Sequence, residues 1–273
     1  MPEPTMSLHH AGRILQVGSR TSAPPRQVWD AWADPRRISQ WFTSRASGLA
    51  VAGETMIWHF DRFRYEVPYR VLVAEPGRRL ALLASTPEHR EQIVEIVVEP
   101  DAGGSALTLT NSGFRYGAEW DEEYESVYSG WTMALGVMQY YLENHFGQDR
   151  AEFFAMRPAR FSYAQLLPYY RSPAGLSVWL ATAASMGDIG EPYSMDLRHG
   201  ARASGHLLAV TRREVLLSWS EIQGTMELKA FPMDDSHRAI AIRGCGWGLD
   251  AAAAAGIELH LAAALDRLTG VLE

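Results

Sequence analysis

The sequence has little of several residue types, and each shortage excludes a class of protein. Its one cysteine, Cys245, cannot form a disulfide within the chain, so nothing indicates an oxidising compartment. Lysine also occurs once, at Lys229, and the formal net charge is −7. No basic run offsets this charge, and phosphate backbones are bound by clustered Lys and Arg. We therefore expect no nucleic-acid partner.

Long apolar runs and catalytic motifs are missing as well. No stretch of about 18 uncharged apolar residues occurs, and the start, MPEPTMSLHH, is polar where a signal peptide would be apolar. We expect a cytoplasmic protein that does not insert into membranes. The sequence has no His-x-x-x-His, Cys-x-x-Cys or Gly-x-Ser-x-Gly spacing. It therefore predicts no metal site, no cofactor and no catalytic residue, and a protein without enzymatic activity is favoured.

The first half of the chain changes its hydrophobic period twice. Residues 14–21 alternate like a strand, and residues 25–42 suit two short helices interrupted at Asp34-Pro35. Residues 54–114 have a period of two with turn residues between the runs, which predicts an antiparallel meander of about five strands. Residues 120–146 return to helical spacing and predict the longest helix. One face of that helix should pack on the sheet through Trp131, Leu135, Met138 and Leu142.

The second half repeats this order. Residues 71–83 (VLVAEPGRRLALL) resemble residues 207–219 (LLAVTRREVLLSW), and the later strands and last helix match at similar offsets. Upstream, APPRQVW (23–29) matches SPAGLSVW (172–179) at a larger offset, which predicts that the second copy is shorter. We therefore expect a first domain over 12–147, a connector over 148–171, and a second, shortened domain over 172–273.

Several motifs resemble a known family. The strand, the two short helices, the meander and the long helix are similar to the START and SRPBCC superfamily, in the branch similar to the C-terminal domain of the activator of heat-shock protein 90 ATPase. The matching residues are Val28, Trp29, Asp34, Pro35, Trp41, Gly130, Trp131, Leu135 and Leu142. The resemblance implies an α+β helix-grip fold, in which a curved antiparallel sheet wraps a long C-terminal helix and leaves an apolar cavity. The internal repeat predicts two copies of it.

The candidate ligand-binding residues are apolar and mostly aromatic. If the fold is a helix-grip, they would line the space between sheet and helix, as aromatic walls do in small-molecule sites. The same side chains would equally suit a filled core. Strand alternation places His59 on the opposite face from Trp58, so His59 is predicted to lie in solvent. The predicted ligand-binding residues are Trp58, Phe60, Tyr65, Tyr69, Trp131, Leu135 and Met138.

Three functions fit these observations. The leading hypothesis is an intracellular binding protein that holds an apolar or amphipathic small molecule in the sheet–helix cavity of its first copy, with the second copy as a structural partner. One alternative is a polyketide-cyclase-like enzyme that uses the same cavity. Another is a co-chaperone-type interaction module whose partner is a chaperone, and a homodimer is a further expectation. The sequence does not name the ligand.

Overall fold

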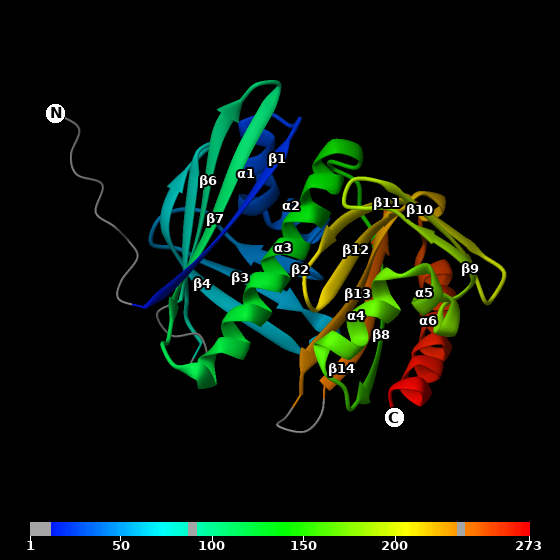
Figure 1. Cartoon of the computed structure of the whole chain (residues 1–273). Helices are drawn as coiled ribbons and strands as arrows, with labels where there is room; N and C mark the ends of the chain where they lie inside the picture. The colour runs from blue at the N-terminus through cyan, green and yellow to red at the C-terminus, as the bar shows by residue number, and fades with distance from the viewer. Residues whose placement is uncertain (1–11, 87–91, 234–237) are drawn as a thin grey trace. The chain divides into compact units, whose positions relative to one another are not determined.

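The computed structural model describes residues 12–86, 92–233 and 238–273. The chain divides into two compact units, one up to Gly147 and one from Gln148. Each contains a seven-stranded antiparallel sheet followed by a long helix (Figure 1). The chain is thus α+β, with two copies of the helix-grip architecture. Within the described residues, no helix is both long and apolar enough to cross a membrane.

The first unit has a sheet with the strand order β1-β7-β6-β5-β4-β3-β2. Strands β3 to β7 form the predicted five-stranded meander, and β1 pairs with β7 at one edge. Its elements are β1 (Arg13–Thr21), α1 (Pro25–Ala33), α2 (Pro35–Ser39), β2 (Arg45–Gly48), β3 (Thr55–Phe60), η1 (Asp61–Phe63), β4 (Tyr65–Glu75), β5 (Arg79–Ala84), β6 (Ile93–Asp101), β7 (Gly104–Phe114), η2 (Ala118–Trp120) and α3 (Asp121–Asn144).

The break between α1 and α2 has a local cause. Asp34 has an extended backbone, as expected for a residue that precedes a proline, and so it ends α1. Its carboxylate then accepts a hydrogen bond from the Arg36 N–H at 2.8 Å and caps α2. Pro35 occupies the first turn of α2, where no backbone donor is needed. The predicted interruption at Asp34-Pro35 is confirmed.

One face of the first sheet is the core face, and period-two alternation selects it. Leu80 pairs with Ile96, which pairs with Leu109, and all three side chains are fully buried. Helix α3 packs against β1 and buries Trp131, Leu135, Met138 and Leu142. The indole N–H of Trp131 donates to Asn111 Oδ1 on β7 at 2.9 Å. The predicted stripe of α3 is therefore core.

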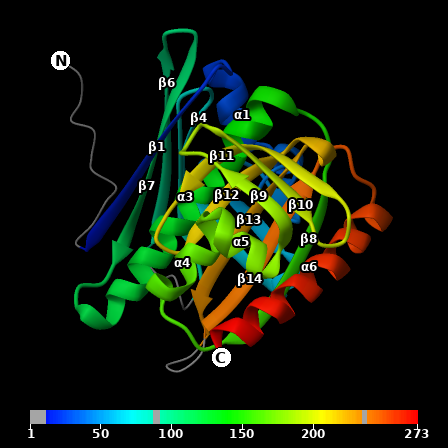
Figure 2. The same ribbon diagram turned by 45° about the vertical axis from the view of Figure 1, so that its right-hand side comes forward.

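The second unit repeats the element order of the first. Its sheet has the order β8-β14-β13-β12-β11-β10-β9, and α6 packs against β8, where both views place it (Figures 1 and 2). Its elements are β8 (Ala151–Ala159), α4 (Tyr163–Arg171), α5 (Pro173–Trp179), β9 (Ala181–Met186), β10 (Pro192–Leu197), β11 (Arg202–Val210), β12 (Glu214–Trp219), η3 (Ser220–Ile222), β13 (Gly224–Pro232), β14 (Arg238–Gly246) and α6 (Ala251–Leu272).

Residues 148–171 do not form the expected connector. They contain β8, which pairs with β14, and α4, which carries the buried side chains Leu166 and Tyr170. Helix α4 begins with a capping box in which Ser162 and Gln165 satisfy each other's backbone donors. The aromatic residues of this segment are therefore core residues of the second unit, and the capping box was a readable signal for a helix start.

The second unit, Gln148–Glu273, is shorter than the first, but it lacks none of the strands and α-helices of the first unit. The Trp41 indole donates to the carbonyl of Ala31 at 2.9 Å, and the Trp179 indole donates to the carbonyl of Tyr169 at 2.9 Å. Each acceptor lies ten residues before its tryptophan. Trp179 thus corresponds to Trp41 and not to Trp29. The earlier match failed because a proline in the first helical turn is common to α1, α2 and α5.

Candidate functional site

Eight aromatic side chains of the first unit form a continuous group, here called the aromatic cluster. They come from α1, the turn after α2, the strands β3 and β4 near one edge of the sheet, and α3. Five of them were predicted as ligand-binding residues from the sequence pattern together with the helix-grip resemblance: Trp58, Phe60, Tyr65, Tyr69 and Trp131. The members are Trp32, Trp41, Phe42, Trp58, Phe60, Tyr65, Tyr69 and Trp131.

Phe42 lies at the centre of the aromatic cluster. Its ring centroid is 5.1 Å from Trp41 and 5.6 Å from Trp131, both in stacked geometry. It also meets Trp58 and Phe60 edge-on, each at 5.5 Å. Offset-stacked and edge-on contacts are the favourable arrangements for aromatic rings. Phe42 therefore joins residues of the strand β3 and the helix α3, which are far apart in sequence.

Trp32 and Trp58 form the deep end of the aromatic cluster. The Trp58 ring lies 4.5 Å from Tyr69 and 6.2 Å from Trp32. Trp32 in turn meets Trp41 edge-on at 4.8 Å and Trp131 at 6.1 Å. The structure thus joins the predicted residues Trp58, Tyr69 and Trp131 through Trp32, which was not predicted.

Exposure rises along the aromatic cluster. Trp58 is 1% exposed, Phe42 and Phe60 are half-buried, and Tyr65 is 38% exposed and stacks on Phe60 at 6.4 Å. The cluster therefore runs continuously from the core to the surface. Phe60 and Tyr65 lie at its solvent end, whereas the predicted residues Leu135 and Met138 are buried on α3.

Two indole groups in the aromatic cluster are unsatisfied. Trp131 donates to Asn111 and Trp41 donates to Ala31, as described above. The Nε1 atoms of Trp32 and Trp58 are buried and have no hydrogen-bond partner among the residues that the structure describes. An unsatisfied buried donor costs about 1–3 kcal/mol, so native proteins keep few of them. The rings of Trp32 and Trp58 are neighbours, so both unsatisfied donors lie at the deep end of the aromatic cluster.

The corresponding region of the second unit has its donors satisfied. The Trp179 indole donates to Tyr169, and the Trp219 indole donates to the carbonyl of Arg202 at 3.1 Å. With Trp179 matched to Trp41, Trp32 corresponds to Tyr170, whose hydroxyl donates to the carbonyl of Lys229 at 2.9 Å. At this matched position the first copy has an indole without a hydrogen-bond partner among the described residues, whereas the second copy has a bonded hydroxyl.

His59 lies elsewhere than expected. It is 7% exposed, because β2 and β4 flank its strand and pair it with Arg45 and Glu66. Its Nδ1 lies 3.0 Å from Glu66 Oε2, and its Nε2 lies 3.4 Å from Ser47 Oγ. The predicted solvent exposure is wrong, although the strand register does place His59 on the opposite face from Trp58. It is not part of the aromatic cluster.

The aromatic cluster is neutral at physiological pH. Burial, with a smaller contribution from Tyr65, raises the pKa of Tyr69 well above its ordinary value. The Tyr69 hydroxyl therefore keeps its proton. A surface made of neutral rings and N–H and O–H groups suits the apolar part of an apolar or amphipathic ligand better than it suits a charged group.

The second unit buries a charged network on β12, β13 and β14. Lys229 Nζ lies 2.9 Å from Glu227 Oε1 and 3.5 Å from Glu214 Oε1, and the Arg243 guanidinium pairs with Glu227. Burial raises the pKa of Glu214 to about 7, whereas Arg243 and Lys229 overcome the burial of Glu227 and lower its pKa to about 2. Each charge has a partner, so the network is explained by its own ion pairs. Within the described ranges, no group of three or more His, Cys, Asp or Glu is placed to hold a metal ion.

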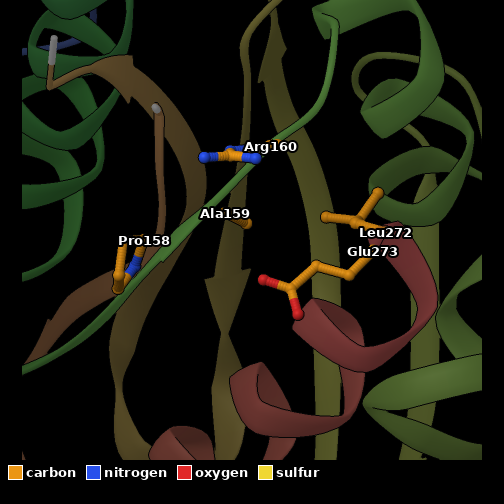
Figure 3. A pocket seen from close by; sticks show the side chains of 5 residues that line it. All are labelled: Pro158, Ala159, Arg160, Leu272 and Glu273. Atoms are coloured by element: carbon orange, nitrogen blue, oxygen red, sulfur yellow. The ribbon is translucent and has the colours of Figure 1, made fainter. Parts of the chain in front are cut away.

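A pocket of about 580 Å³ lies in the second unit, where the end of β8 approaches the end of α6 (Figure 3). The figure shows that its lining combines two charged side chains with small or aliphatic ones. It contains no aromatic ring and none of the predicted ligand-binding residues. The lining residues are Pro158, Ala159, Arg160, Leu272 and Glu273.

Sequence reasoning missed Trp32, Trp41 and Phe42 as members of the site. The sequence pattern predicts only that they belong to a segment of two short helices. The available signal was the density of large rings, three within eleven residues, in a segment that must cover the sheet. Which strands those rings would meet is a long-range property that the local pattern does not contain.

The fold and the motifs together define a class: a helix-grip domain in tandem with a second copy. The family model for Activator of Hsp90 ATPase homolog 1-like protein matches residues 22–143. The first unit is thus similar to this family, which confirms the resemblance inferred from its motifs. A search of curated proteins gave no match.

Three solved structures illustrate the similarity. The Aha1 dimer from Colwellia psychrerythraea is 17% identical over 49% of this chain and 97% of its own, with a TM-score of 0.43. CalU16 from Micromonospora echinospora is 25% identical over 48% of this chain and 74% of its own, with a TM-score of 0.41. DynU16, from the dynemicin biosynthetic locus, is 20% identical over 95% of this chain and 99% of its own, with a TM-score of 0.42.

Proposed function

We propose that the first unit binds an apolar or amphipathic small molecule against the aromatic cluster. The observation that carries this proposal is the cluster's continuity from the buried Trp58 through the half-buried Phe42 to the exposed Tyr65. A filled core needs no chain of rings that reaches the surface. A bound molecule does need one, because it must enter from solvent and then exchange water for apolar contacts.

The aromatic cluster also suits binding more than catalysis. Its members are neutral, and the nearby titratable pair of His59 and Glu66 is excluded from it by the strand register. A cyclase-like reaction in the same place therefore stays an unsupported alternative. A chaperone partner and a homodimer likewise stay predictions from the sequence.

The test uses the full chain and the fluorescent probe 1-anilinonaphthalene-8-sulfonate. Phe42→Ala removes the central ring, and we expect it to weaken probe binding about tenfold, because one buried phenyl group contributes roughly 1.5–3 kcal/mol. The matched control is Phe231→Ala, which removes a half-buried ring from β13 in the second unit. It should leave the affinity unchanged.

Two results would contradict the proposal. One is equal weakening by Phe42→Ala and Phe231→Ala, which would indicate nonspecific probe binding. The other is unchanged binding in Phe42→Ala, with the folded state verified by circular dichroism. Native mass spectrometry of the purified chain adds an independent measurement, since a retained hydrophobic molecule should be lost from Phe42→Ala and kept by Phe231→Ala.

A further inference from the structure

We infer that the ligand of the first unit carries oxygen acceptors, and that the indole N–H groups of Trp32 and Trp58 bind them. This inference rests on the proposed function and specifies its ligand class: a planar, largely aromatic molecule with carbonyl or comparable oxygen atoms. A hydrocarbon or a simple acyl chain would not satisfy it.

Most of the tryptophan indoles in the two units have a hydrogen-bond acceptor. The first unit has indoles at Trp29, Trp41 and Trp131 that donate to Arg79, Ala31 and Asn111 at 3.3, 2.9 and 2.9 Å. In the second unit, Trp179 and Trp219 also donate. Trp32 and Trp58 are at most 1% exposed, and among the described residues nothing accepts from their Nε1 atoms. The exceptions thus fall together in the aromatic cluster.

Trp32 and Trp58 lie close together beside Phe42. The Trp32 and Trp58 ring centroids are 6.2 Å apart, and both rings contact Phe42. One small molecule seated against Phe42 would meet both rings. An indole N–H is a donor only, so its missing partner must be an acceptor. The remaining surface is aromatic, which favours a flat ring system by stacking.

The two copies differ at the position of Trp32. Tyr170 replaces Trp32 in the second unit, and its hydroxyl is already bonded to the carbonyl of Lys229. The helix-grip fold can therefore satisfy the donor at this position, as it does in the second unit. The open donors belong to the copy whose aromatic rings reach the surface.

The experiment compares two probes on the full chain: anthraquinone-2-sulfonate and anthracene-2-sulfonate. They share ring shape and charge, and differ by two carbonyl oxygens. We expect the quinone to bind about tenfold more tightly, since a net hydrogen bond contributes on the order of a tenfold change in affinity. In Trp58→Phe and in Trp32→Phe, this ratio should fall toward one. In the control Trp219→Phe, whose indole bonds within the second unit, it should stay unchanged.

The use of a ratio keeps the inference separate from the proposed function. If both probes bind the first unit equally well, or if the ratio survives in Trp58→Phe and Trp32→Phe, the inference fails while ligand binding stands. If neither probe binds, both fail. Loss of ring volume or a partial loss of folding affects the two probes alike, so neither effect imitates a selective loss of quinone binding. A fall in the ratio with Trp219→Phe as well would also overturn the inference.

Discussion

Replacing Trp131 with phenylalanine should destabilise the first unit by about 2–4 kcal/mol. The substitution removes the N–H that donates to Asn111 Oδ1 at 2.9 Å, between side chains that are 8% and 2% exposed. Leaving the Asn111 acceptor unsatisfied costs about 1–3 kcal/mol. The smaller ring also weakens the contacts with Phe42 and Trp32, which adds about 1 kcal/mol.

A double-substitution cycle separates these two contributions. Asn111→Leu alone leaves the Trp131 donor buried and should also cost about 1–3 kcal/mol, whereas the double variant removes both partners. Its cost should therefore be smaller than the sum of the single costs by about 1 kcal/mol or more. The Asn111 amide also donates to the carbonyl of Ile93 at 3.3 Å, so some cost persists in both variants that lack it.

The assay is hydrogen exchange read by mass spectrometry over a urea series, on the full chain. Two compact units need not unfold together, and peptides from β7 and α3 report on the first unit alone. A change below about 0.5 kcal/mol in Trp131→Phe would refute the proposed burial of this hydrogen bond. Strictly additive costs in the double variant would refute the pairing itself.

Three further predictions concern stability. Met138→Ala should cost about 2–5 kcal/mol in urea unfolding of the first unit, because a fully buried side chain is lost, and a cost near zero would show that α3 is not packed on the core. Arg64 has a φ of 49°, in the left-handed region that glycine adopts without strain. Arg64→Gly should therefore relieve up to about 1 kcal/mol of backbone strain and raise the melting temperature. The control Arg62→Gly, in the adjacent 3₁₀ turn, should not raise it. Burial raises the pKa of Glu214 to about 7, so the native state keeps a proton that the unfolded state loses near pH 4.5. The free energy of unfolding should therefore fall as the pH rises from about 5 to 7. This fall is at most about 3 kcal/mol, and Glu214→Gln should reduce it. If the melting temperatures of the wild-type protein and of Glu214→Gln depended on pH in the same way, the raised pKa of Glu214 would be contradicted.

The fold was largely predictable because its main signals are local. Alternation over residues 54–114 selected the inward positions of β3 to β7, and the spacing of four, three and four from Trp131 selected the buried face of α3. Asp34-Pro35 marked the helix break through backbone sterics. These features depend on neighbours in sequence, so a single sequence contains them.

The errors arose where a local signal was shared by several elements. A proline in the first turn occurs in α1, α2 and α5, and it led to the match of Trp179 with Trp29. That match made 148–171 look like a connector. The hydrogen bonds of Trp41 and Trp179 identify the true correspondence, but they are contacts between helices and are invisible in the sequence.

The candidate site was predicted in part, for a similar reason. Alternation identified Trp58 and Tyr69 as inward-facing, yet the contact of Trp58 with Trp32 and Phe42 depends on how the helices cover the sheet. His59 was expected in solvent because alternation specifies a face and not what covers that face. Unsatisfied donors are also a property of the whole fold, since they require knowing every neighbouring acceptor.

The most direct test of the central claim is a spectrum of the tryptophan indole N–H groups. The full chain is labelled with ¹⁵N at tryptophan, each resonance is assigned by single Trp→Phe substitutions, and anthraquinone-2-sulfonate is added. We predict that the indole N–H resonances of Trp32 and Trp58 shift on binding, because both groups gain a hydrogen-bond acceptor. The resonances of Trp179 and Trp219, which already donate within the second unit, should stay in place. Shifts confined to Trp179 and Trp219, or probe binding that moves neither Trp32 nor Trp58, would contradict a binding site on the aromatic cluster of the first unit.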